Sequence, residues 1–136
     1  EFALRYFTAG SMCRRFSIEE GIPFNPPYAE VTLKSDEQGD PLISERICIM
    51  KGLLAEGQYN EALEILEKVG EVLKKELAQM NLTLIDFKIE IGYDESGKIY
   101  VVDEITPDIW RIRDKNGNIP NQIECGNLIL EKIANA

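Results

Sequence analysis

Four residues with chemically useful side chains fall within one short stretch. Asp86, Lys88 and Glu90 alternate with apolar residues across positions 84–92, and Asp103 follows shortly after. Magnesium in proteins takes one or two carboxylates together with phosphate oxygens, and a lysine can meet an anionic substrate. The alternative is a solvated hairpin face on which Lys and Asp pair across strands. The pattern by itself leaves both interpretations open.

The elements that must position these residues form a predicted β-hairpin. Apolar residues at odd positions alternate with charged ones, which is the period of a strand; they are Ile85, Phe87, Ile89 and Ile91. The segment Asp94–Gly97 predicts the turn, and residues 98–105 resume a β-rich run. A turn centred on this segment places Lys88 opposite Asp103. Glu90 then faces Val101, so we expect the four charged residues to share one face.

A second group of polar residues lies near the start of the chain. Residues 2–8 read as a strand, and Ser11 is the expected N-cap of a short helix from Met12 to Phe16. Arg5 lies in the strand, and Arg14 and Arg15 lie in the helix. A helix N-terminus beside arginines can bind a phosphate or carboxylate. The alternative is a capped surface helix with solvated arginines.

Several segments of the sequence also resemble the signatures of a known enzyme family. LIDFKIEIG, which contains Asp86, Lys88 and Glu90, resembles a signature of the phosphoribosylaminoimidazole-succinocarboxamide synthases, also called SAICAR synthetases. The family's DE-x-(S/T)-PD-x-x-R string is matched next by Asp103, Glu104, Thr106, Pro107, Asp108 and Arg111. Near the N-terminus, Arg-x-x-x-Ala-Gly-Ser matches another signature through Arg5 and Ser11. Lys34-Ser35-Asp36 resembles the family's Lys-Asn-Asp segment, with Ser in place of Asn.

This resemblance implies an ADP-forming carboxylate–amine ligase of purine biosynthesis. Such enzymes join L-aspartate to carboxyaminoimidazole ribonucleotide and use ATP and Mg²⁺. The resemblance implies catalytic, substrate-positioning roles for Asp86 and Lys88. It implies that the substrate is bound by Arg5, Ser11, Asp108 and Arg111. It also implies that Lys34, Glu90 and Asp103 meet the nucleotide, and that Glu90 and Asp103 hold the metal.

The resemblance runs from Arg5 to the last predicted helix and corresponds to the second, C-terminal domain of these enzymes. We therefore expect residues 1–136 to form a single domain without the N-terminal one. The sequence starts without Met, inside an expected strand, which suggests a piece of something longer. The expected partners are the three small substrates and the missing domain or a separate chain that replaces it. A homo-oligomer is an open alternative.

Two further functional interpretations are kept. The chain could be a noncatalytic fragment that binds a nucleotide or a phosphorylated metabolite. It could also belong to a related ligase with a different carboxylate substrate, because the bulky Trp110 precedes Arg111 where family members usually have small residues. Trp110 could equally be a core or domain-interface residue.

Composition excludes several classes of function. The net charge is −9 and the pI is about 4.6, which argues against nonspecific binding to nucleic acid or anionic membranes. The sequence has no histidine, so histidine acid–base chemistry is excluded within it. Three widely spaced cysteines predict packed, reduced thiols in a cytoplasmic protein: Cys13, Cys48 and Cys125.

The predicted fold is α+β, a largely antiparallel sheet with helices packed on one face. An apolar stripe at three- and four-residue spacing predicts a long helix from Asn60 to Met80, which includes Gly70. We expect this helix to cover the apolar face of the hairpin. Ser44 is the expected cap of a helix to about Leu54, and a final helix is expected over Ile123–Ala134. A loop is expected over Ser17–Pro27, followed by a strand over Tyr28–Ser35.

Overall fold

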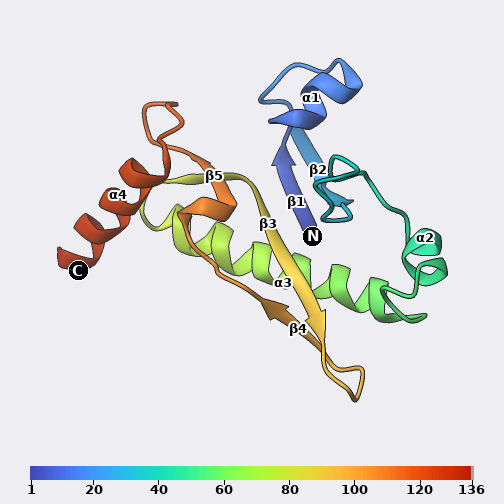
Figure 1. Cartoon of the computed structure of the whole chain (residues 1–136). Coiled ribbons are helices and arrows are strands. Elements are labelled where there is room, and N and C mark those ends of the chain that lie inside the picture. Colours follow the sequence, from blue (N-terminus) through green and yellow to red (C-terminus); the bar gives the residue numbers. More distant parts are fainter. Residues whose placement is uncertain (136) are drawn as a thin grey trace.

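A five-stranded, wholly antiparallel sheet with helices is the framework of the computed structural model, which describes residues 1–135 (Figure 1). The strands run in the order β2-β1-β3-β4, and β5 also pairs with β3. This confirms the predicted α+β class. The strands are β1 (Phe2–Phe7), β2 (Pro23–Val31), β3 (Thr83–Tyr93), β4 (Ile99–Val102) and β5 (Trp110–Arg113). The helices are α1 (Ser11–Phe16), α2 (Glu45–Met50), α3 (Gln58–Ala78) and α4 (Gln122–Ala134), with a 3-10 turn η1 (Pro107–Ile109).

The long helix α3 packs across the central strands, as Figure 1 shows. Its stripe buries Ala62 and Leu66 completely against apolar residues of β1 and β3. Gly70 lies where the helix comes closest to the sheet, since a Cβ there would lie 2.5 Å from the Tyr6 hydroxyl and 2.9 Å from Leu4. The predicted helix and its close approach at Gly70 are therefore correct, with bounds shifted by two residues.

The hairpin has a different register from the predicted one. Glu90 pairs with Val102 rather than Val101, and β4 ends there, so Asp103 does not lie opposite Lys88. The reason is the loop: Asp94 and Lys98 close it, and Gly97 has a left-handed φ of 86°. This is a three-residue loop with a glycine bulge, which shifts the partner strand by one residue relative to a two-residue turn. Asp103 itself has a φ of 66° and leaves the strand direction.

A bulge near the start of β3 changes a second predicted position. The pairing of β3 with β5 slips by one residue between Leu84 and Asp86. Such an extra residue resets which side chains face the core. Leu84, Phe87 and Ile89 belong to the main core, whereas Ile85 is buried outside it. The expectation that Ile85 shares the core face was therefore wrong.

Strand β2 covers a segment that was expected to be a loop. It runs from Pro23 through Pro26 and Pro27 to Val31, and the predicted extension to Ser35 is absent. β2 is an edge strand paired only with β1, so prolines without an N–H leave no central ladder bond missing. The next segment forms only an isolated bridge between Thr32 and Leu42.

The remaining helices largely follow the predictions. Ser44 caps α2 as expected, but the helix ends at Met50 rather than near Leu54. Asn121 and Glu124 form a capping box at the start of α4, close to the predicted bounds. All three cysteines are free and buried, as predicted. Within residues 1–135, no helix has the length and apolar character that crossing a membrane requires.

Candidate functional site

Three charged residues meet on adjacent strands of the sheet. β1 and β3 place Arg5 directly opposite Asp86, and β3 and β5 place Asp86 directly opposite Arg111. Such cross-strand neighbours are within reach of one another. Arg5 Nη1 donates to Asp86 Oδ2 at 2.6 Å, and Arg111 Nε lies 3.1 Å from Asp86 Oδ1. Each oxygen of the carboxylate therefore faces its own guanidinium group.

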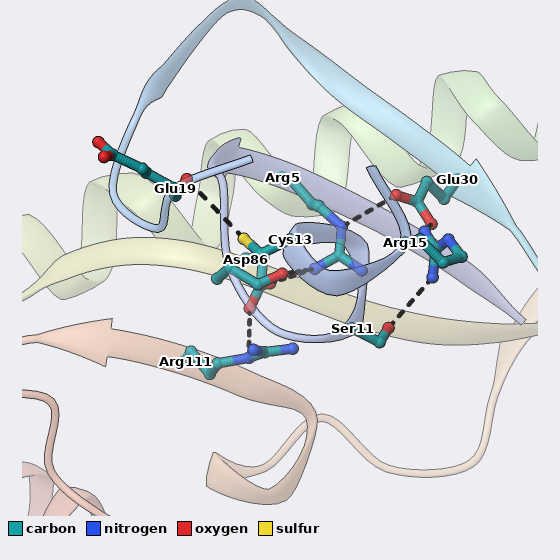
Figure 2. Close-up of polar contacts among 9 residues, drawn as sticks. Arg5, Ser11, Cys13, Arg15, Glu19, Glu30, Asp86 and Arg111 are labelled. Atoms are coloured by element: carbon teal, nitrogen blue, oxygen red, sulfur yellow. Dashed lines mark hydrogen bonds and ion pairs between the residues drawn. The ribbon is translucent and has the colours of Figure 1, made fainter. Parts of the chain in front are cut away.

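A second carboxylate extends this network toward α1. Glu30 lies on β2, diagonal to Arg5, whose Nε donates to Glu30 Oε1 at 3.3 Å. Arg15 Nη2, from α1, donates to Glu30 Oε2. Arg15 Nη1 also donates to Ser11 Oγ at 3.2 Å. Figure 2 shows Arg5 between the two carboxylates. The cluster alternates in sign across five residues: Arg15, Glu30, Arg5, Asp86 and Arg111.

The inner members of this alternating cluster are buried and its ends are open. The side chains of Arg5, Glu30 and Asp86 are 8%, 3% and 6% exposed, whereas those of Arg15 and Arg111 are 35% and 43% exposed. Burial raises the pKa of Asp86, and the Arg111 and Arg5 guanidinium groups oppose that shift. The outer guanidinium groups therefore keep N–H donors available to an anion from solvent.

The cluster lines a cavity of about 780 Å³. Five of the 15 Lys and Arg residues of the chain line it, together with five of the 24 Asp and Glu residues. The cavity is thus locally neutral in a chain of net charge −9, and Glu30 and Asp86 are already paired. It also contains all six residues that the motifs single out for substrate or catalysis: Arg5, Ser11, Asp86, Lys88, Asp108 and Arg111.

Ser11 lies in this cavity in a different local role from the predicted one. The N-cap of α1 is Gly10, and no side chain caps the helix. Ser11 is the first residue of the helix, and its hydroxyl accepts from Arg15 instead. Gly10 has a φ of 67°, a conformation that glycine adopts readily, and this turns the chain sharply into α1. The expectation of a serine cap was wrong, but the hydroxyl faces the expected arginine-rich region.

The residues predicted to meet the nucleotide form a separate group. Lys34 Nζ donates to Glu90 Oε1, and none of Lys34, Glu90 and Asp103 lines the 780 Å³ cavity. The hydrogen bond with Glu90 raises the pKa of Lys34 and lowers the pKa of Glu90. Asp103 adds to the raised pKa of Lys34 by its charge, so the three lie in one electrostatic neighbourhood.

The same group contains the two carboxylates that were predicted to hold the metal, Glu90 and Asp103. Among the described residues, no cluster of three or more His, Cys, Asp or Glu side chains could hold a metal by itself. Two carboxylates still suit magnesium, because this ion commonly keeps water or substrate phosphate oxygens as its other ligands. The donor set therefore fits a metal that arrives with a phosphate-bearing ligand.

Trp110 lies between the core and the cavity. Its indole Nε1 donates to Cys125 Sγ at 3.2 Å, which connects β5 to α4. It packs against the main core and also lines the cavity beside Arg111. The indole therefore has the structural role that was one of its two predicted alternatives.

The sequence interpretation omitted Glu30 and gave Arg15 only a general electrostatic role. Glu30 occupies the polar side of an alternating strand, which is also the pattern of a solvated residue. Only the pairing of β2 with β1 brings it to Arg5. A buried acidic position could have been suspected from the arginine excess near the N-terminus, but its partner could not.

Comparisons with known proteins agree on one family. The family model described as SAICAR synthetase matches residues 1–124. A phosphoribosylaminoimidazole-succinocarboxamide synthase of Methanocaldococcus jannaschii is 44% identical over 115 residues, covering 85% of this chain and 48% of that protein. One of Finegoldia magna is 40% identical over 118 residues, covering 87% and 51% respectively. The chain thus spans about half the length of the curated relatives it matches.

Solved structures give the same result for the fold. A SAICAR synthetase in complex with ADP superposes with a TM-score of 0.89 at 32% identity, covering 99% of this chain and 62% of that one. The SAICAR synthetase of Pyrococcus horikoshii superposes with a TM-score of 0.87 at 31% identity, covering 99% and 64%.

Proposed function

The chain belongs to the SAICAR synthetase family, and from that premise we propose that it supplies the substrate-binding part of an ATP-dependent ligase of purine biosynthesis. The proposed reaction joins L-aspartate to carboxyaminoimidazole ribonucleotide and releases ADP and phosphate. The observation that carries the proposal is the convergence of motifs from the two ends of the chain. Arg5 and Ser11 share one cavity with Lys88, Asp108 and Arg111.

The charges of the cavity suit a ribonucleotide that carries a phosphate and a carboxylate. Arg111 offers its exposed guanidinium edge, and a guanidinium fork matches both groups in a bidentate manner. The Ser11 hydroxyl can donate to the same ligand while accepting from Arg15. Asp108, which is exposed at the cavity, is suited to a ribose hydroxyl.

Asp86 and Lys88 have different roles in this proposal. Asp86 is buried and paired with two guanidinium groups, so it acts by orienting Arg5 and Arg111. The side chain of Lys88 is 52% exposed and its Nζ lies 3.8 Å from Glu1 Oε2; among the described residues that line the cavity it is the one lysine. Lys88 is therefore the residue we assign to the reacting carboxylate and to the charge that develops on it.

The proposed chemistry has two steps. A carboxylate oxygen of the ribonucleotide attacks the γ-phosphorus of ATP, and the bond to the bridging oxygen breaks to release ADP. The amine of L-aspartate then attacks the acyl carbon, the amide bond forms, phosphate leaves and the amine loses a proton. Activation is required because a carboxylate is a poor electrophile. Lys88 and the guanidinium groups hold the anionic substrates in position for both steps.

The group of Lys34, Glu90 and Asp103 is proposed for the nucleotide end of the reaction. Glu90 and Asp103 would hold Mg²⁺, which when bound neutralises phosphate charge during transfer. Lys34 now pairs with Glu90, so nucleotide binding would require Lys34 to move from the carboxylate to a phosphate oxygen. The similarity to a SAICAR synthetase in complex with ADP supports nucleotide use. We also propose that the rest of the nucleotide site comes from a further domain, in the same chain or a partner.

A second candidate function retains the ligase chemistry with another carboxylate substrate. The observation that favours it is Trp110, whose indole lines the cavity beside Arg111. Its hydrogen bond to Cys125 and its packing against the core give the indole a structural reason to be there. We therefore keep carboxyaminoimidazole ribonucleotide as the preferred substrate.

The test is the release of ADP from ATP by the native protein, measured with both carboxyaminoimidazole ribonucleotide and L-aspartate and with each omitted. We expect release only with both substrates, and a loss of at least a hundredfold in Lys88→Ala. Lys68→Ala, on the exposed side of α3, is the matched control and should be unaffected. Release that does not depend on the ribonucleotide would overturn the proposed substrate.

A further inference from the structure

Glu30 connects the two arginines that approach the cavity from different elements. We propose that Glu30 is a positioning residue, which fixes the Arg5 and Arg15 guanidinium groups in the orientation that binds the anionic ligand. The proposal rests on the proposed function only for the identity of that ligand. The geometry of the carboxylate stands independently of it.

Both oxygens of Glu30 are committed to guanidinium groups. Oε1 accepts from Arg5 Nε at 3.3 Å, and Oε2 accepts from Arg15 Nη2. The Glu30 side chain is 3% exposed, so water cannot replace either partner. A buried carboxylate is costly unless it is paired and hydrogen-bonded, and these two partners satisfy it. Because the Glu30 carboxylate is itself held in place, it restricts the orientation of both guanidinium groups.

Arg5 is held from three directions. Its Nε faces Glu30, and its Nη1 donates both to Asp86 and to the carbonyl oxygen of Ala9, the latter at 3.2 Å. A planar guanidinium group held by acceptors on both sides cannot rotate without losing one of them. Glu30 is the acceptor on the β2 side of this guanidinium group, as Figure 2 shows.

Arg15 depends on Glu30 more strongly than Arg5 does. Its other side-chain partners belong to the same short helix: the Ser11 hydroxyl, one turn earlier, and the Phe16 ring, whose centroid lies 5.2 Å from Arg15 Cζ. The hydrogen bond to Glu30 therefore connects the Arg15 guanidinium group to the sheet. Without it, a side chain that is 35% exposed would sample many rotamers and bind an anion at greater entropic cost.

Glu30 also keeps the charge of the site in balance. The cluster has three guanidinium groups and two carboxylates, and Glu30 separates Arg15 from Arg5. Removal of its charge would leave two cations close together with no negative charge between them, and they would repel. The expected result is movement of Arg15 into solvent, away from the cavity.

The test uses Glu30→Gln, which keeps the side-chain size and removes the charge. We expect the KM for carboxyaminoimidazole ribonucleotide to rise about tenfold or more, because the ligand must then order the Arg15 side chain that Glu30 no longer holds. The KM for ATP should stay within twofold of the wild type. Glu64→Gln, an exposed change on α3, is the matched control and should change neither value.

A double-mutant cycle separates positioning from a general structural effect. In an Arg15→Gln background, Glu30→Gln should add no more than about threefold, because the two changes remove one shared interaction. Full, independent multiplication of the two effects would overturn the proposal, as would an unchanged KM in Glu30→Gln. Arg15→Gln alone tests a partly exposed residue and keeps the proposal falsifiable if Glu30→Gln fails to fold.

A direct spectroscopic readout distinguishes failure of this inference from failure of the proposed function. In ¹⁵N–¹H spectra of the arginine Nε groups, the Arg5 signal should be shifted and protected in the wild type and lose both properties in Glu30→Gln. If the wild type binds no carboxyaminoimidazole ribonucleotide, the proposed function fails. Inorganic pyrophosphate then serves as the probe, and equal affinity in wild type and Glu30→Gln would overturn the role of Glu30.

Discussion

The guanidinium group of Arg111 lies directly against the α-carbon of Gly10. A Cβ at Gly10 would lie 2.7 Å from the central guanidinium carbon, which no side chain could tolerate without displacing Arg111. Gly10 belongs to the turn between β1 and α1, and Arg111 belongs to β5. The β1–α1 turn therefore leaves room for the Arg111 side chain only because residue 10 is glycine, although the two segments lie far apart in the sequence.

Gly10→Ala should weaken ligand binding through Arg111. The added methyl group must displace the guanidinium, and the φ of 67° also strains an alanine by roughly 1–3 kcal/mol. Gly117→Ala is the control for a positive φ alone, since its φ is 84° and no neighbour lies within 4 Å. We expect both variants to lose stability in urea unfolding and Gly10→Ala to lose more, because it also displaces Arg111 from Asp86. Only Gly10→Ala should lose affinity for carboxyaminoimidazole ribonucleotide; equal affinity in the two variants would contradict the fit.

Asp86→Asn should destabilise the fold strongly. The change removes the charge that faces Arg5 and Arg111, and breaking a buried ion pair typically costs about 3 kcal/mol or more. Asp108→Asn is the control, because this carboxylate is exposed at the same cavity. It should change the free energy of unfolding by less than about 0.5 kcal/mol. A cost below about 1 kcal/mol for Asp86→Asn would show that the pairing contributes little.

Gly70→Ala should destabilise the contact between α3 and the sheet by about 1–3 kcal/mol, because the methyl group overpacks the space beside Tyr6 and Leu4. Where no such contact exists, glycine in a helix makes the fold less stable than alanine does. Gly126→Ala in α4, with nothing within 4 Å, should therefore gain up to about 1 kcal/mol. Opposite signs for the two changes in thermal or urea unfolding are the expected result. Stabilisation by Gly70→Ala would contradict the close approach.

Tyr6 should make the fold sensitive to alkaline pH. Burial raises the pKa of Tyr6 from 10.0 to about 12, with smaller contributions from Glu71 and Glu67. Between these values the unfolded chain has released the proton and the folded chain still holds it, so the free energy of unfolding falls as pH rises. This contribution is complete below pH 10 and lost by about pH 12.

Tyr6→Phe should flatten that part of the profile and leave the stability at pH 7 equal or slightly higher, because the Tyr6 hydroxyl has no hydrogen-bond partner. The exposed Tyr93→Phe serves as the control and should leave the profile as it is. Urea unfolding at intervals between pH 8 and pH 12 is the measurement. Parallel profiles for wild type and Tyr6→Phe would rule out Tyr6 as the source of the alkaline loss.

Local periodicity was sufficient to predict the main elements of the fold. The stripe of α3 and the alternation of β3 both identify their elements, since each pattern follows directly from the geometry of helix or strand. The short strand β5 escaped prediction because Trp110–Arg113 is too brief to show a period. The first part of β2, residues 23–27, escaped prediction because prolines usually end a strand, and its place at the sheet edge makes them acceptable.

The motifs named six of the residues that line the cavity, but not how these residues contact one another. The motifs named Arg5, Asp86 and Arg111, but their contacts depend on which strands are neighbours. Glu30 shows the limit most clearly, because its role appears only when β2 lies beside β1. Asp103 was misplaced for a related reason: a one-residue difference in the hairpin loop changes which residues face each other.

The most direct test of the central claim is calorimetric titration of the native protein with carboxyaminoimidazole ribonucleotide. Arg111→Lys should weaken binding about tenfold or more, since lysine keeps the charge but loses both the Nε that faces Asp86 and the planar guanidinium group at the cavity. Arg46→Lys, an exposed change on α2, should bind as the wild type does. Absence of binding by the wild type, or equal affinity in all three proteins, would contradict the assignment of this cavity to the substrate.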